Sequence, residues 1–206
     1  MPPLAGLRKT MGKKDSGEIP RRLLGHTGVR VSALALGGYH LGAVKTKREA
    51  IRIVHEAVDA GLTFMDNAWE YHEGYSEELM GEALAGRREK VFLMTKVCTH
   101  GRDKKAALRQ LEQSLRRLKT DHLDLYYLHR LDPDVPVDEP LRALDDLVRA
   151  GKVRYIGAST TAAWQFVEAL WVSKELHLNR FVAETPPYNI LDRRIERELL
   201  PSNNDR

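Results

Sequence analysis

The chain has 206 residues, of which 42% are hydrophobic and 30% charged, and its formal net charge is +4 at pH 7. This length supports one globular domain with its own core and is too short for two large ones. No run approaches the roughly 18 apolar residues of a membrane span, and the N-terminus lacks the apolar segment of a secretory signal. We therefore expect a soluble, cytoplasmic protein with no membrane partner.

The positive charge is confined to the beginning of the chain. Residues 1–22 hold six basic and two acidic side chains, an excess equal to the net charge of the whole chain. We interpret residues 1–20 as a flexible, solvated basic tail, with binding to an anionic partner as the weaker alternative, and we expect no nucleic-acid partner. The single cysteine, Cys98, cannot form an internal disulfide, which is consistent with a reducing compartment.

After this tail, strand and helix patterns alternate. Residues 22–31 predict a β-hairpin around a glycine-bearing turn. Strands are expected near 33–37, 62–66, 91–95, 123–128, 153–157 and 181–184, and helices near 47–60, 76–86, 103–118, 138–150 and 162–176. Such an alternation predicts an α/β protein with a parallel sheet and right-handed crossovers.

Local signals indicate where several helices begin and end. Ser76 and Asp138 are expected to cap the helices that follow them, and Gly61 and Gly151 to end the helices before them. The helix near 103–118 carries an apolar stripe opposite basic, acidic and amide side chains, as a helix on the outside of a barrel does. That stripe consists of Ala107, Leu108, Leu111, Leu115 and Leu118.

The pattern predicts a TIM-type (β/α) barrel truncated to about six βα units. A closed barrel needs eight units, commonly about 250 residues. We expect the barrel domain to span residues 21–201, with a polar C-terminal tail at residues 202–206. An open barrel has unpaired strand edges, so self-association is expected as well.

Four polar residues lie at or just after the ends of three consecutive expected strands: Asp66, Tyr71, Lys96 and His129. In parallel barrels the carboxyl ends of the strands carry the chemistry. Each residue alone has an ordinary structural explanation, but together an acid, a phenol, an ammonium and an imidazole predict a catalytic site.

These residues lie within a longer likeness. The chain resembles the aldo-keto reductase family over about residues 21–201. The segments that carry the resemblance are 66–71 (DNAWEY), 74–84 (GYSEELMGEAL), 91–96 (VFLMTK), 118–129 (LKTDHLDLYYLH), 151–159 (GKVRYIGAS) and 186–189 (PPYN). The resemblance implies a (β/α)₈ barrel that reduces the carbonyl of a small aldehyde or ketone with NADPH, NADH remaining open.

The resemblance also implies roles for the four rim residues. Hydride delivered to a carbonyl carbon leaves an alkoxide that must be protonated as it forms. Tyr71 would be the acid, and Lys96 would stabilise its phenolate. Asp66 would hold Lys96 and face the cofactor ribose, and His129 would orient the carbonyl or assist the proton transfer.

Three further residues are implied in cofactor binding. Ser159 lies where the family hydrogen-bonds the nicotinamide carboxamide. Thr160 stands where the family often has Asn, and Thr185 where it typically has Gln. A threonine does not offer the donor and acceptor pair of an amide, so we expect a weakened nicotinamide contact.

Two other functions remain open. The expected strands stop before the seventh and eighth, which in this family carry the aromatic that stacks on nicotinamide and the loop that binds the phosphates. A non-catalytic barrel fragment that needs a partner is therefore the first alternative. A metal-dependent barrel hydrolase is the second and weaker one, since histidines lie near the ends of the first four expected strands. They are His40, His72, His100 and His129.

Overall fold

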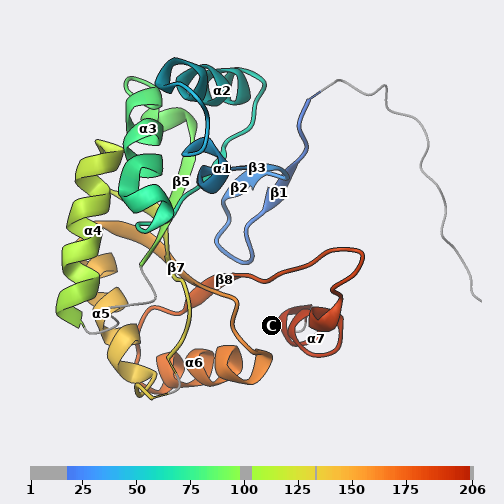
Figure 1. The fold of residues 1–206 in the computed structure, drawn as a ribbon. Coiled ribbons are helices and arrows are strands. Elements are labelled where there is room, and N and C mark those ends of the chain that lie inside the picture. The colour runs from blue at the N-terminus through green and yellow to red at the C-terminus, as the bar shows by residue number, and fades with distance from the viewer. Residues whose placement is uncertain (1–17, 98–103, 133, 205–206) are drawn as a thin grey trace, which may run out of the picture.

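The computed structural model describes residues 18–97, 104–132 and 134–204. A six-stranded parallel sheet curls into part of a barrel, with helices on its outer side (Figure 1). Its strands follow chain order: β3 (Ala35–Gly37), β4 (Phe64–Asp66), β5 (Phe92–Val97), β6 (Leu123–Leu128), β7 (Val153–Ser159) and β8 (Phe181–Thr185). The sequence-based prediction of an open TIM-type barrel of six βα units is confirmed.

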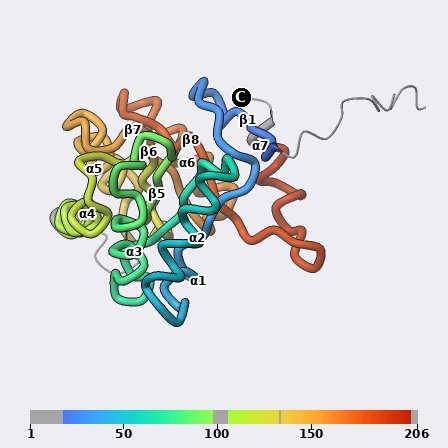
Figure 2. Tube along the Cα trace, turned by 90° about the horizontal axis from the view of Figure 1, so that it is seen from above, coloured from blue at the N-terminus to red at the C-terminus, as the bar shows by residue number. Residues whose placement is uncertain are grey.

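The connections between the strands are helices, as the parallel order requires. The main ones are α2 (Lys47–Asp59), α3 (Tyr75–Ala83), α4 (Lys104–Leu118), α5 (Asp138–Arg149) and α6 (Ala163–Glu175). They lie side by side around the outside of the sheet, as the view from above also shows (Figure 2). Gly61 and Gly151 follow α2 and α5 with φ of 87° and 72°, so both predicted helix ends are confirmed.

A hydrophobic cluster lies on each face of the sheet. The larger cluster fills the layer between sheet and helices and includes Tyr126 and Leu128 of β6. The smaller one lies on the concave face and includes Leu125 and Tyr127 of the same strand. Since successive strand residues point to opposite faces, β6 is buried on both sides, which explains its nearly continuous apolar sequence.

The predicted hairpin forms from β1 (Arg21–Leu23) and β2 (Arg30–Ser32), which pair antiparallel outside the main sheet. Val31 belongs to the concave-face cluster, and Leu24 and Val29 pack against that cluster. The hairpin turn also approaches the last strand, because a Cβ at Gly25 would lie 3.0 Å from the carbonyl oxygen of Val182. The hairpin therefore packs against the core of the barrel.

Some local predictions were wrong. Ser76 does not cap α3: Gly74 takes that place with φ of 96°, and Ser76 is buried inside the helix, where its Oγ donates to the Gly38 carbonyl at 2.7 Å. Asp138 is the first residue of α5, preceded by Val137 without a side-chain cap. At Ser76 a tertiary contact, which a cap pattern does not include, takes up the side chain.

Two short α-helices in the described residues were not predicted. Helix α1 (Gly38–Leu41) directly follows β3, and α7 (Leu199–Asn204) continues into the segment expected to be a polar tail. Leu199 is buried, and the Ser202 Oγ donates to the Leu199 carbonyl at 2.9 Å. The buried Leu199 thus anchors a short helix that ends in the polar residues Ser202, Asn203 and Asn204. The proposed division into tail, barrel domain and tail stays a prediction.

None of the helices in the described ranges has both the length and the apolar character needed to cross a bilayer.

Candidate active site

The strand register brings the predicted rim residues to one end of the sheet. Asp66 is the last residue of β4 and pairs with Met94 of β5. Lys96 lies two residues further along β5 and pairs with Tyr127 of β6. His129 directly follows β6. Parallel strands in this register carry all three residues to the carboxyl edge of the sheet.

Lys96 is the centre of the site. Its side chain is only 4% exposed, and its Nζ donates to the Asp66 carboxylate and, at 2.8 Å, to the Asn67 carbonyl. The third contact is to the Tyr71 hydroxyl at 3.4 Å, with Nζ 5.1 Å from the centroid of the Tyr71 ring. A buried ammonium with a paired carboxylate and a phenol oxygen within reach favours proton transfer at that phenol.

Tyr71 reaches this position from a loop and not from a strand end. Beyond β4 the backbone follows β5, because Asn67 N donates to Met94 O and Trp69 N donates to Lys96 O, both at 3.1 Å. Tyr71 then begins a short 3-10 turn that leads into α3.

His129 borders the same space. Its ring centroid lies 6.2 Å from that of Tyr71, and its Nδ1 lies 2.8 Å from a carboxylate oxygen of Glu70. The two groups therefore interact electrostatically. Burial lowers the pKa of His129 and outweighs the neighbouring Glu70 carboxylate, which raises it. The imidazole is therefore neutral at neutral pH.

The three expected cofactor residues also lie at this edge. Ser159 ends β7 and is 5% exposed, and its Oγ donates to the Thr185 carbonyl at 3.3 Å. Thr160 follows in the left-handed region with φ of 54°, and its amide donates to the same carbonyl at 3.2 Å. Thr160 and Thr185 are exposed. The structure thus brings Ser159, Thr160 and Thr185 together.

The buried phenol of Tyr127 lies between the four rim residues and the three residues expected to bind the cofactor, because β6 lies between β5 and β7. Tyr127 faces the concave side, and burial raises its pKa to about 12, with a side-chain hydrogen bond to Thr185 opposing the rise. Gly157 of β7 makes room for the ring, because a Cβ there would lie 2.0 Å from the Tyr127 Cε1. Tyr127 is thus a packed, neutral part of the site.

Glu184 of β8 contacts the turn at Thr160 and Thr161 that follows β7. The sequence did not predict this role. The Glu184 Oε1 accepts from the Thr161 amide at 3.0 Å, while its Oε2 is buried and has no hydrogen-bond partner among the described residues. Burial raises the pKa of Glu184 to about 7, against hydrogen bonds from the Thr161 and Thr160 amides that lower it.

We therefore expect stability to depend on the protonation of Glu184. The folded state holds this proton up to about pH 7, whereas the unfolded chain releases it near 4.5, so stability falls as pH rises through this window. In urea unfolding at several pH values, the wild type should lose about 1 to 3 kcal/mol relative to Glu184→Gln. Parallel pH profiles of the two proteins would contradict the assignment.

Within the residues that it describes, the structure gives no support to a metal site. No group of three His, Cys, Asp or Glu side chains in the described ranges is placed to hold a metal ion. The Nε2 of His72 lies 2.8 Å from the Tyr39 carbonyl, so that ring serves the loop structure. Cys98 and His100 lie outside the described residues.

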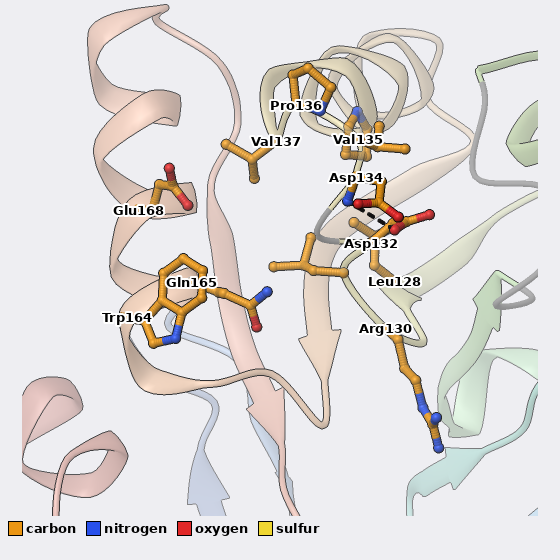
Figure 3. Close-up of a pocket in the computed structure, with 12 residues that line it drawn as sticks. Leu128, Arg130, Asp132, Asp134, Val135, Pro136, Val137, Trp164, Gln165 and Glu168 are labelled. Atoms are coloured by element: carbon orange, nitrogen blue, oxygen red, sulfur yellow. Dashed lines mark hydrogen bonds between the residues drawn. The ribbon is translucent and has the colours of Figure 1, made fainter.

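A cavity of about 350 Å³ lies beside the segment that follows β6, and none of the four rim residues lines it (Figure 3). It opens between the segment that follows β6 and the N-terminal turns of α5 and α6. Leu128 and Pro136 line one side, and Trp164, Gln165 and Glu168 of α6 line the other. Leu128 packs in the layer between sheet and helices, so this cavity lies outside the barrel wall.

These observations define the class of protein: a β/α barrel protein with a buried lysine, a carboxylate, a phenol and an imidazole at the carboxyl edge of its sheet. Comparison with known proteins names the family. The Aldo/keto reductase family model matches residues 33–205, and the chain belongs to this family.

The individual relatives include an oxidoreductase and an aldo-keto reductase. The chain is 38% identical over 201 residues to the "Uncharacterized oxidoreductase YrpG" of Bacillus subtilis (strain 168), covering 88% of this chain and 62% of that protein. It is 35% identical to Aldo-keto reductase dtxS3 of Metarhizium robertsii, covering 85% of this chain and 58% of the relative. The chain therefore spans less than two thirds of the length of these relatives.

A solved structure shows the same fold. The thermostable aldo-keto reductase Tm1743, crystallised with the inhibitor epalrestat, superposes with a TM-score of 0.82 at 35% identity. The match covers 89% of this chain and 68% of that one.

Proposed function

We propose that this chain carries the proton-donating site of a carbonyl reductase that acts on small aldehydes or ketones. The observation that supports this most is the contact of the buried Lys96 ammonium with both Asp66 and the Tyr71 hydroxyl. Family membership supports the same reaction class.

In the proposed mechanism Tyr71 is the acid. A carbonyl oxygen that gains negative charge needs a proton at once, and a phenol donates it more readily when a cation stabilises the phenolate. Lys96 supplies that cation at 3.4 Å. Asp66 and the Asn67 carbonyl hold the ammonium in place, and burial keeps competing water away from it.

His129 orients the substrate. Since burial keeps its imidazole neutral, one ring N–H can donate to the carbonyl oxygen without carrying a charge of its own. The ring stands nearly perpendicular to Tyr71, at 78°, so the two side chains form adjacent walls of the site.

The hydroxyls at the ends of β7 and β8 fit a nicotinamide. Each hydroxyl can donate to or accept from a carboxamide, so Ser159, Thr160 and Thr185 can hold it. The two threonines lack the fixed donor and acceptor pair of an amide, so this contact is weaker than the one typical of the family. NADPH, or NADH as the alternative, would supply the hydride. Asp66 would serve both Lys96 and the cofactor ribose.

The test is a direct assay of carbonyl reduction. The purified chain, alone or complemented by the strands that complete the barrel in its relatives, is mixed with NADPH and a panel of aldehydes and ketones. Substrate-dependent loss of NADPH supports the proposal. Absence of turnover both alone and complemented would refute it and favour a non-catalytic fragment.

We expect the 206-residue chain by itself to bind NADPH weakly. In parallel barrels the phosphate site lies after strands seven and eight, and charged phosphates held by few fixed donors contribute little affinity. Thr185 also lacks an amide. Titration with NADPH, followed by protein fluorescence, should give a dissociation constant well above the roughly micromolar range. Saturation at low micromolar NADPH would contradict this expectation.

A further inference from the structure

The loop that carries Tyr71 has an unfavourable backbone. After Tyr71, three successive residues adopt positive φ: His72 at 49°, Glu73 at 58° and Gly74 at 96°. Left-handed conformations are unfavourable for side chains such as His and Glu, and they persist only where the surroundings hold them. The loop therefore needs an external support to keep Tyr71 in place.

Arg117 of α4 contacts this loop on both sides of Tyr71. Its Nη1 donates to the Trp69 carbonyl at 3.0 Å, and its guanidinium carbon lies 5.4 Å from the centroid of the Trp69 ring. The same guanidinium packs against Gly74, where a Cβ would lie 2.1 Å from that carbon. One side chain thus contacts the residues two before and three after Tyr71.

Arg117 is itself held by a buried carboxylate. Its Nη1 lies 3.3 Å from the Oε2 of Glu77, which is 0% exposed. The other oxygen of Glu77 accepts from the Thr95 hydroxyl at 2.7 Å. Burial raises the pKa of Glu77, and the hydrogen bonds from Thr95 and Arg117 oppose that rise.

This network links the two halves of the candidate site. Thr95 directly precedes Lys96 on β5, and Arg117 holds the loop of Tyr71. Glu77 contacts both Thr95 and Arg117. The separation of the Tyr71 hydroxyl from the Lys96 ammonium, 3.4 Å, therefore depends on groups that do not contact either atom.

We propose that Arg117, oriented by Glu77, is a positioning residue that holds the Tyr71 hydroxyl against Lys96 through the Trp69 carbonyl and Gly74. The effect on catalysis rests on the function proposed above, whereas the effect on the loop does not. Arg117 acts from the helix layer, so it orders the acid without contacting the substrate.

The test compares Arg117→Met and Arg117→Lys with the matched control Arg116→Met. Arg116 is the exposed neighbour on the same helix. Hydrogen exchange followed by mass spectrometry reports on peptides covering residues 67–75, and carbonyl reduction and NADPH titration are measured on the same proteins. Arg117→Lys keeps the charge and most of the packing, so it answers the question where Arg117→Met does not fold.

We expect exchange in residues 67–75 to rise about tenfold or more in Arg117→Met and less in Arg117→Lys, with Arg116→Met like the wild type. Turnover should fall by about 10²-fold in Arg117→Met, the size expected from a misplacement of about 1 Å, while NADPH affinity stays within about twofold. Unchanged exchange in both Arg117 variants would overturn the proposal, as would equal losses of turnover and NADPH affinity. If the wild type shows no turnover, the exchange result still decides whether Arg117 holds the loop, and only the proposed function fails.

Discussion

Tyr71→Phe should lower the rate of carbonyl reduction by about 10² to 10⁴-fold, the usual contribution of general acid catalysis. The substitution keeps the ring, its edge contacts with Tyr39 and His129, and the fold of the loop. It removes only the hydroxyl that lies 3.4 Å from the Lys96 ammonium. The loss should therefore appear in kcat, with little change in NADPH affinity or thermal stability.

The matched control is Tyr75→Phe. Tyr75 begins α3 four residues further along the chain and is 41% exposed. The Tyr75→Phe variant should retain wild-type turnover. Equal turnover in the wild type and Tyr71→Phe would reject Tyr71 as the proton donor, and a similar loss in both variants would point to damage of the loop.

The 206-residue chain, purified by itself, should self-associate. Its sheet has two edges, β3 and β8, which pair with no further strand in the part of the chain that the structure describes. Unpaired strand edges invite pairing with other chains. The segment after β8 adds apolar surface, since Ile190 and Leu191 are 88% and 94% exposed. Large exposed apolar side chains together with open edges favour oligomers over monomers.

Light scattering combined with thermal unfolding tests this expectation. The double variant Ile190→Ser, Leu191→Ser separates the two sources, because it removes the exposed apolar surface and leaves the strand edges. Association that persists in the variant assigns it to the edges. A monodisperse wild-type monomer with one sharp, reversible transition would show that six βα units are stable alone.

The sequence by itself determined the order of elements and the residues at the rim. Apolar runs such as 123–128 and the stripe on residues 103–118 are local patterns with the period of a strand and of a helix, and strand β6 and helix α4 follow them closely. Since strands that alternate with helices run parallel, Asp66, Lys96 and His129 had to meet at one edge. Nothing more than their chain positions was needed.

The tertiary structure decided what holds Tyr71. Arg117 and Glu77 lie on helices whose polar residues look alike in the sequence, and no spacing indicates that one of them turns inward to a carbonyl 48 residues away. The raised pKa of Glu184 likewise follows from burial behind the turn at Thr161. These features depend on contacts between segments far apart in the chain, and local periodicity contains no information about such contacts.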